Sequence, residues 1–241
     1  MEIKGKNALI TGSAKRIGKV IALNLAKEGA NVIIHYNSSE EEALKVKEEA
    51  KSYGVKAFTV KANLERIDEV MYLSKKSLEL LGSIDILINN ASVYYPVPLK
   101  EITEKDVDRF YNIHVKAPLF LSKELGFLMY KKGNGRIINI ADYSAIRPYP
   151  NYTAYTISKG AMLTLTRALA KEFAPYVLVN AVLPGPIVPP DDLEDKSIPL
   201  KKTVLKRWGG EVEVWKAVKY FIETDFTTGS FLPVEGGRLI Y

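Results

Sequence analysis

The feature that most constrains the fold is a regular alternation of short apolar runs with amphipathic stretches. Runs rich in Ile, Val and Leu recur along the 241 residues, at Asn7–Thr11, Asn31–Tyr36, Lys56–Val60, Asp85–Asn89, Arg136–Ile140, Leu178–Leu183 and Phe231–Val234. Such runs are typical of strands that are buried on both faces. Helical patterns separate them, as in the recurrence of Ile17, Ile21 and Leu25. The alternation predicts one α/β domain over residues 1–241, with a doubly wound, Rossmann-like parallel sheet of about seven strands.

Composition excludes several kinds of site and partner. The chain has no cysteine, which excludes disulfides and thiolate chemistry, and with only two histidines, His35 and His114, we expect no metal site. No apolar run approaches the roughly 18 residues of a membrane span, and no secretory leader is recognisable, so we expect a cytoplasmic protein without a membrane partner. The net charge of +6 is spread along the chain and accompanies no nucleic-acid-binding motif. We therefore expect no nucleic-acid partner.

The first predicted strand leads into a glycine-bearing turn, "TGSAKRIG", which a helix and a second strand follow. Gly12 permits a tight turn, and Gly18 permits close packing of the helix. The free N–H groups at the start of such a helix favour a phosphate. In this strand–helix–strand context, the turn predicts a dinucleotide site.

The end of the second strand indicates which dinucleotide binds. An Asp or Glu there usually contacts a free ribose 2′-hydroxyl, but residues 29–39 contain no acid. The chain has "HYNSS" at residues 35–39 instead, and the turn carries Lys15 and Arg16. Hydroxyls, an amide and two cations suit a 2′-phosphate, so the sequence predicts NADPH rather than NADH. Ser39 and Glu42 also have the spacing of a helix capping box, so capping is an alternative role for this serine.

A proline-rich segment near the carboxyl end interrupts the alternation. It runs from Pro184 to Arg207 and includes five prolines. It is either a disordered insert or a lid over the carboxyl edge of the sheet, where doubly wound folds bind ligands. We favour a substrate lid at residues 186–207, because of the motif that precedes it.

Five motifs occur in the order found in the short-chain dehydrogenase/reductase family, which the chain resembles along its whole length. They are "TGSAKRIG" in the first turn, "NNAS" at 89–92, "YTISK" at 155–159, "PGPI" at 184–187 and "TTGSFLPVEGG" at 227–237. The resemblance implies an NADPH-dependent oxidoreductase of a small-molecule substrate, assembled as a homotetramer.

The resemblance also implies roles for particular residues. Tyr155 resembles the family's proton donor, and Lys159 resembles the residue that binds the nicotinamide ribose and lowers the pKa of the tyrosine. A free tyrosine titrates near ~10, and a cation one helical turn away favours its phenolate. The implied cofactor contacts are Gly12, Ser13, Lys15, Arg16, Ile17, Gly18, His35, Tyr36, Asn37, Ser38, Ser39, Asn63, Leu64, Asn90, Ala91, Ser92, Tyr155, Lys159, Pro184, Gly185 and Ile187. Asn63 departs from the Asp that the family usually has near the adenine.

Two further departures concern the catalytic centre. The family usually has a serine thirteen residues before the tyrosine, to hold the substrate carbonyl, and this chain has Asp142 there. The family usually relays protons through an asparagine at the position of His114. A histidine carries protons near neutral pH, so His114 is a candidate catalytic residue, with a buried, hydrogen-bonded histidine as the alternative. The alternative for Asp142 is a helix cap or a salt bridge.

Asp142 is the clue to the substrate. A ketone oxygen only accepts hydrogen bonds, so an ionised carboxylate beside it repels it. Either Asp142 is neutral or the substrate offers N–H donors, as a reduced pterin does. The pteridine reductases are the family branch with this acid, and the resemblance places Arg16 between cofactor phosphate and pterin, Ser92 against the substrate, and Tyr94 over the pterin ring.

The favoured function is hydride transfer from NADPH to a pterin or dihydrofolate-like ring, with Tyr155 as proton donor and Asp142 assisting. One alternative is a carbonyl reductase such as a 3-oxoacyl-acyl-carrier-protein reductase, against which Asp142 argues. A second is a non-catalytic, cofactor-binding regulator, against which Tyr155 and Lys159 argue.

Overall fold

The structure, a computed structural model, describes residues 1–189 and 195–241 and contains one seven-stranded parallel sheet. The strand order is β3-β2-β1-β4-β5-β6-β7, and each predicted apolar run overlaps one strand. The strands are β1 Asn7–Ile10, β2 Asn31–Tyr36, β3 Ala57–Lys61, β4 Ile86–Asn89, β5 Gly135–Ile140, β6 Val177–Pro184 and β7 Phe231–Val234. The predicted single-domain, Rossmann-like fold is confirmed.

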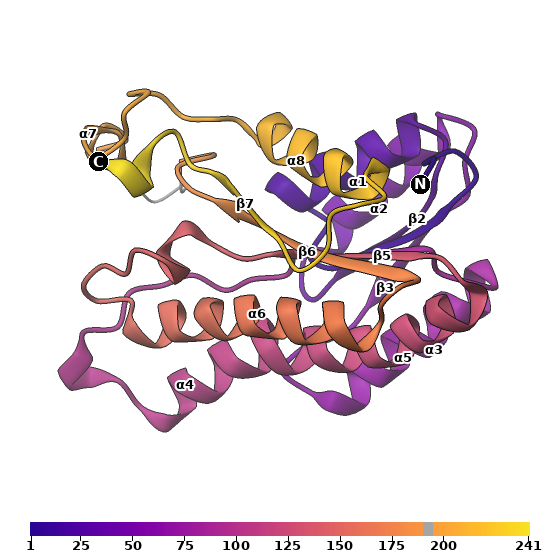
Figure 1. The fold of residues 1–241 in the computed structure, drawn as a ribbon, viewed down its shortest axis with the longest axis horizontal. Coiled ribbons are helices and arrows are strands. Elements are labelled where there is room, and N and C mark those ends of the chain that lie inside the picture. The colour runs from indigo at the N-terminus through magenta and orange to yellow at the C-terminus, as the bar shows by residue number, and fades with distance from the viewer. Residues whose placement is uncertain (190–194) are drawn as a thin grey trace.

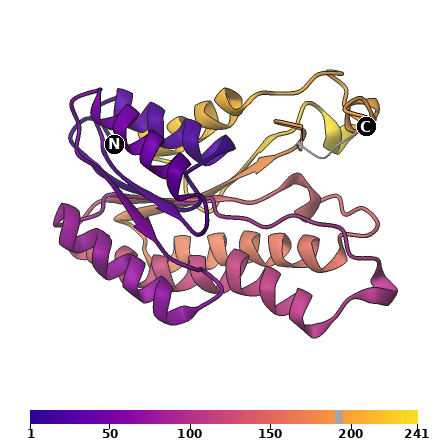
Figure 2. The ribbon, with the colours of Figure 1, turned by 180° about the vertical axis from the view of Figure 1, so that it is seen from behind.

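Helices cover both faces of the sheet in two layers (Figures 1 and 2). One layer holds α1 Arg16–Lys27, α2 Glu40–Lys51 and α8 Glu211–Glu223. The other holds α3 Ile67–Leu81, α4 Glu104–Tyr111, α5 Ala117–Lys132 and α6 Thr153–Glu172. A π-helix, Asn112–Lys116, joins α4 to α5, and short turns of helix occur at Leu99–Glu101, Tyr143–Ala145, Ile198–Lys201 (α7) and Arg238–Ile240. Figure 1 shows α7 beside the C-terminus.

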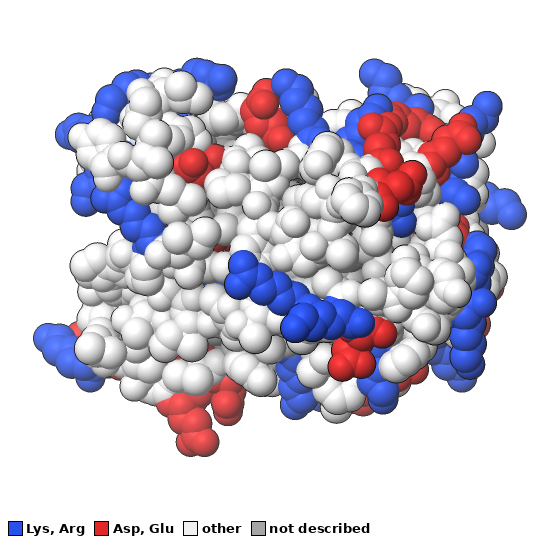
Figure 3. Space-filling view, in the orientation of Figure 1, with Lys and Arg blue, Asp and Glu red and all other residues white. Residues whose placement is uncertain are grey.

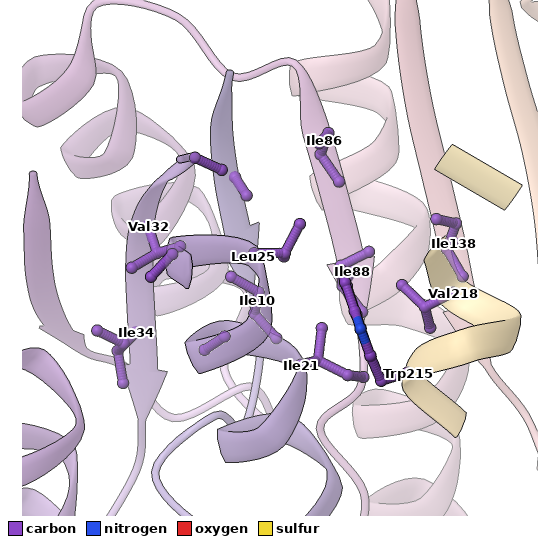
Figure 4. Packing of buried hydrophobic residues seen from close by; sticks show 14 of the residues in the cluster. Ile10, Ile21, Leu25, Val32, Ile34, Ile86, Ile88, Ile138, Trp215 and Val218 are labelled. Atoms are coloured by element: carbon purple, nitrogen blue, oxygen red, sulfur yellow. The ribbon is translucent and has the colours of Figure 1, made fainter. Parts of the chain in front are cut away.

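The core is divided between the two faces because successive strand residues point to opposite sides. Leu9 packs with the cluster under α3 and α5, whereas its neighbour Ile10 packs with the cluster under α1 and α8. Figure 4 shows the second cluster, in which Ile21 of α1 and Val218 of α8 lie over strand residues such as Ile88. Burial of each such side chain contributes about 1.5–3 kcal/mol, which holds both helices against the sheet.

The strand order changes direction at β1. β2 and β3 are added on one side of β1, whereas β4 pairs with its other side and the later strands follow β4. The carboxyl ends of the strands on either side of this point form the crevice in which doubly wound folds bind ligands. Most of the predicted site residues follow the carboxyl ends of β1 to β6. The fold therefore brings them to one edge.

One local expectation is wrong. Ser39 stands at the start of α2, but its side chain makes no capping hydrogen bond. The carboxylate of Glu42 instead lies 2.7 Å from Lys15 Nζ, so the charge on the neighbouring turn competes successfully with the cap. Thr103, by contrast, forms a complete capping box with Asp106 at the start of α4.

Basic and acidic side chains are interspersed on the face shown in Figure 3. No helix in the described part of the chain is both long and apolar enough to cross a membrane. Of the predicted lid at 186–207, residues 190–194 lie outside the described residues, and α7 lies in the remainder.

Candidate active site

The glycine turn after β1 is packed against the end of β4. Gly12 has a φ of +63°, and a Cβ added there would lie 2.8 Å from the Cα of Ala91, while one on Gly18 would lie 2.3 Å from Gly12 O. Asn90 Nδ2 donates to the carbonyls of Thr11 (2.8 Å) and Gly12 (3.0 Å). Thr11 Oγ1 accepts the N–H groups of Asn90 and Ala91. Thr11 was missed in the sequence, although a hydroxyl immediately before the glycine was a usable signal.

His35 secures the same turn from behind. Its side chain is 2% exposed, with Nδ1 2.9 Å from the Gly12 nitrogen and Nε2 3.0 Å from Ala62 O. Because Nδ1 accepts the Gly12 N–H, the ring proton belongs on Nε2, which donates to the carbonyl. Burial lowers the pKa of His35 to about 4, so the ring is neutral at pH 7. His35 thus joins β2 to the turn and to the end of β3, with both ring nitrogens engaged by the protein.

The predicted phosphate-binding groups surround the start of α1. Lys15 occupies the N-cap of α1, and its side chain makes no capping hydrogen bond to the N–H groups of the first turn. Those groups and the helix dipole fit a cofactor phosphate. Asn37 and Ser38 are exposed at the end of β2. The site therefore has the donors and the cations that a phosphorylated dinucleotide requires.

Arg16 connects this end of the site with the predicted lid. Its guanidinium donates to the carbonyl oxygens of Val188 (3.0 Å) and Pro189 (3.3 Å), and its φ of +51° bends the chain at the first residue of α1. The segment that follows β6 is therefore tied to the phosphate end of the crevice.

The remaining predicted cofactor residues lie around the same edge. Asn63 Oδ1 accepts the N–H of Glu65 at 3.0 Å, which shapes the turn after β3. Ser13 Oγ is buried and donates to Ile10 O at 2.8 Å. The other predicted cofactor positions differ in exposure. The buried ones are Tyr36, Leu64, Pro184 and Ile187. Ser92 is exposed, and the partly buried ones are Ile17, Ser39, Asn90, Ala91 and Gly185.

The structure brings Asp142, Tyr155 and Lys159 together at the ends of β5 and α6. Asp142 follows β5, and its Oδ1 accepts the N–H of Ser144 at 2.7 Å. The Tyr155 hydroxyl donates to Asp142 Oδ2 at 3.1 Å. Lys159, 1% exposed, donates from Nζ to the carbonyl of Ile140 at 3.0 Å. The carboxylate is therefore bonded directly to the predicted proton donor.

The pKa of Tyr155 departs from the expectation. Burial, and after it the charge of Asp142, raise the pKa of Tyr155 well above its ordinary value. Burial also raises the pKa of Asp142 and lowers that of Lys159 to about 8. Burial and Asp142 therefore outweigh the expected depression by Lys159, whose ammonium lies 5.7 Å from the ring centroid while the carboxylate accepts the hydroxyl itself. Tyr155 consequently keeps its proton at neutral pH.

His114 is fully buried within the π-helix. Its Nε2 accepts the N–H of Val93 (3.2 Å) and lies 2.9 Å from Ser92 Oγ, while Nδ1 lies 2.8 Å from Ser158 Oγ. These contacts place the ring proton on Nδ1. Burial, and then the charge of Lys159, lower the pKa of His114. The geometry is that of a buried, hydrogen-bonded histidine, the alternative interpretation of this residue. Single π-helical turns are frequent at functional sites.

Aromatic rings border the Asp142–Tyr155 pair. Tyr94 stacks on Tyr152 with centroids 4.7 Å apart and meets Tyr155 edge-on at 5.0 Å. Its hydroxyl lies 3.2 Å from that of Tyr149. Tyr149 and Tyr152 were missed in the sequence, although "RPYPNY" at residues 147–152 contains two aromatic residues shortly before Tyr155.

This arrangement agrees with the comparison to known families. The model of the short chain dehydrogenase family matches residues 6–196. The chain belongs to this family. It is therefore an oxidoreductase.

Among known proteins similar to this dehydrogenase is a 3-oxoacyl-acyl-carrier-protein reductase of Staphylococcus epidermidis, 33% identical over 96% of this chain and 98% of that protein. A solved blue fluorescent protein from a metagenomic library, in complex with NADPH, is 32% identical with a TM-score of 0.93, covering 99% of each chain. FolM alternative dihydrofolate reductase 1 of Brucella canis, complexed with NADP, is 32% identical with a TM-score of 0.92, covering 100% of this chain and 97% of that one.

Proposed function

We propose that this short-chain dehydrogenase is an NADPH-dependent reductase that transfers hydride to a pterin or dihydrofolate-like ring. The observation that carries the proposal is the hydrogen bond between the Asp142 carboxylate and the Tyr155 hydroxyl. A carboxylate accepts hydrogen bonds from ring N–H groups, which a reduced pterin offers and a ketone oxygen does not. The similarity to an alternative dihydrofolate reductase supports this substrate class.

Bound NADPH supplies the hydride in this proposal, and the protein supplies the proton. Tyr155 holds its proton because burial and Asp142 raise its pKa, so it donates to a substrate nitrogen as the adjacent carbon is reduced. Asp142 orients that hydroxyl and accepts a substrate N–H. Lys159 binds the ribose. We also propose that His114, although buried and hydrogen-bonded, serves the proton relay through the hydroxyls of Ser92 and Ser158, and Ser158 donates onward to the carbonyl oxygen of Tyr155.

NADPH is preferred over NADH in this proposal for reasons of charge. Residues 29–39 contain no acid that would repel a 2′-phosphate, and Lys15, Arg16, Asn37 and Ser38 lie exposed around its expected position. Similar structures bind NADPH and NADP. The described residues of the proposed substrate lid are 186–189 and 195–207, and Arg16 tethers the first part at Val188 and Pro189.

The proposed assembly is a homotetramer, as the family resemblance implies. Exposed apolar side chains on α4, α5 and α6 support association of the chain with itself; they are Val107, Tyr111, Leu119, Phe127, Leu128 and Ile157. Light scattering after size-exclusion chromatography should give about four times the chain mass of 26.9 kDa.

A second candidate is a carbonyl reductase of 3-oxoacyl thioesters. It is favoured by the 33% identity with the Staphylococcus epidermidis reductase. Asp142 opposes it, since both oxygens of this carboxyl group accept hydrogen bonds where a carbonyl substrate needs a donor.

Parallel assays of NADPH oxidation with dihydrobiopterin, dihydrofolate and an acetoacetyl thioester discriminate the two candidates. We expect turnover of a pterin or folate, and Asp142→Ser should lower its kcat/KM by about 100-fold because the hydroxyl cannot replace the carboxylate. Asp142→Asn, which keeps the shape and loses the charge, is the matched variant. Turnover of the thioester alone, or unchanged pterin activity in both variants, would overturn the proposal.

A further inference from the structure

Four tyrosines form a continuous wall along one side of the Asp142–Tyr155 pair. The tyrosine wall consists of Tyr94, Tyr143, Tyr149 and Tyr152. Tyr149 is its centre: its ring meets that of Tyr152 at 5.0 Å and that of Tyr143 at 5.9 Å, and its hydroxyl lies 3.2 Å from that of Tyr94. The wall thereby links the loop after β4 to the loop between β5 and α6.

Two members of the wall, Tyr94 and Tyr152, border the reacting groups. Tyr94 and Tyr152 both meet the Tyr155 ring edge-on, at 5.0 and 6.3 Å. Burial, and then the charge of Asp142, raise the pKa of Tyr149, so the phenol remains a hydrogen-bond donor. Tyr94 is 49% exposed, so the wall keeps an accessible face.

The C-terminal segment holds the far end of the wall. Arg238 Nε donates to the Tyr143 hydroxyl at 2.8 Å, and the guanidinium lies 5.3 Å from the centroid of that ring. Another nitrogen of Arg238 donates to the carbonyl of Pro199 in α7. Arg147 in turn donates to the Arg238 carbonyl at 2.6 Å. Tyr143 is thus fixed between the site and the chain terminus.

We propose that Tyr149 is a substrate-specificity residue that selects planar heteroaromatic rings, and that Arg238 is a positioning residue that holds Tyr149 in place through Tyr143. Flat rings gain from stacked and edge-on contacts with tyrosine faces, and their oxygens accept hydrogen bonds from phenols. A linear acyl thioester offers no such face. The inference rests on the proposed pterin reductase function and deepens it.

The test compares KM and kcat for dihydrobiopterin with those for an acetoacetyl thioester. Tyr149→Leu should raise the pterin KM by about three- to tenfold, the range expected for aromatic contacts, with kcat within about twofold. Tyr149→Phe keeps the ring and loses the hydroxyl pair with Tyr94, so its pterin KM should rise less. Thioester kinetics should stay unchanged in both variants. Tyr176→Leu is the matched control, because Tyr176 is an exposed tyrosine that contacts Tyr130 and none of the wall.

Arg238→Met tests the positioning role. Arg238→Met should raise the pterin KM, as Tyr149→Leu does. The double variant should have a pterin KM close to that of Tyr149→Leu, because both substitutions disturb the same tyrosine wall. Additive effects of the two substitutions would overturn the role of Arg238. Equal losses on both substrates, a fall in kcat alone, or no change in Tyr149→Leu would overturn the role of Tyr149. NADPH affinity, measured for every variant, identifies a general loss of folding.

The wild-type assay separates this inference from the proposed function. Turnover of the thioester and not of the pterin would refute the proposed function, and the specificity role would fall with it. Pterin turnover that is insensitive to Tyr149 and Arg238 would leave the proposed function standing and refute the inference alone.

Discussion

The two ends of the crevice each contain a buried histidine, and they are built differently around it. At the cofactor end, His35 bonds to a backbone N–H and a backbone carbonyl, and it braces the glycine turn. At the substrate end, His114 bonds to the hydroxyls of Ser92 and Ser158 as well as to a backbone N–H. The first histidine secures the main chain, whereas the second orders side chains.

The same difference extends to charge. Described groups around the glycine turn are mostly neutral, and the cations Lys15 and Arg16 are exposed on its outer side. The substrate end concentrates Asp142, Tyr155 and Lys159, and burial shifts the pKa of each. Perturbed pKa values of this kind cluster at functional sites. We therefore assign the cofactor end a scaffold role and the substrate end the proposed chemistry.

The largest expected effect concerns the chemistry itself. Tyr155→Phe removes the proton donor and should lower kcat by about 100- to 10,000-fold, the usual contribution of general acid catalysis. NADPH affinity, measured by titration of its fluorescence, should change far less than kcat, because the variant keeps the tyrosine ring and leaves the glycine turn intact. A kcat close to that of the wild type would break the assignment of chemistry to the substrate end.

The next effect concerns the scaffold and pH. The pKa of His35 is lowered from 6.5 to about 4, so the unfolded chain binds the proton more tightly. Stability from this residue is therefore complete above pH 6.5 and is lost as pH falls toward 4, by about 3 kcal/mol. The free energy of unfolding, measured by urea denaturation at pH 6.5 and at pH 4, checks this expectation. His35→Gln, which does not titrate, should lose less between them, and an equal loss would contradict the scaffold role.

Lys159 gives a smaller, graded effect at high pH. With a pKa of about 8, its ammonium loses its proton above that pH and no longer favours charge on the Tyr155 oxygen. The value of kcat/KM should then fall by up to about tenfold per pH unit. Lys159→Arg, which stays charged, should move this limb to higher pH. If kcat/KM falls at the same pH in the wild type and in Lys159→Arg, the fall is caused by another titrating group.

The smallest effect is expected at the edge of the cofactor end. Lys15 binds Glu42 at 2.7 Å, which lowers the pKa of that exposed carboxyl, and Lys15 is also the proposed partner of the 2′-phosphate. Glu42→Gln should therefore tighten NADPH binding about two- to threefold, as for other exposed ion pairs, and leave NADH unchanged. Glu49→Gln, near Lys19 at 3.9 Å, is the control. Equal changes for both cofactors would contradict the 2′-phosphate position.

Much of the fold and part of the site could be predicted from sequence, because both depend on local patterns. Buried parallel strands are continuous apolar runs, and each overlaps a strand in the structure. Asp142, Tyr155 and Lys159 were identified from motifs that resemble those of the family, and the structure brings them together. The pKa of Tyr155 was predicted in the wrong direction, since a spacing of four residues shows the nearby cation but neither the burial nor the hydrogen bond to Asp142.

The sequence alone determined the doubly wound α/β fold, the glycine turn and the residues at the carboxyl edge, because each follows from apolar periodicity or from a short motif. Tertiary structure alone decided how those residues act. His35 holds Gly12 from another strand, Glu42 binds Lys15 instead of capping α2, and Arg238 reaches Tyr143 from the chain terminus. These contacts join residues far apart in the chain, and burial and charge at such contacts set the pKa values.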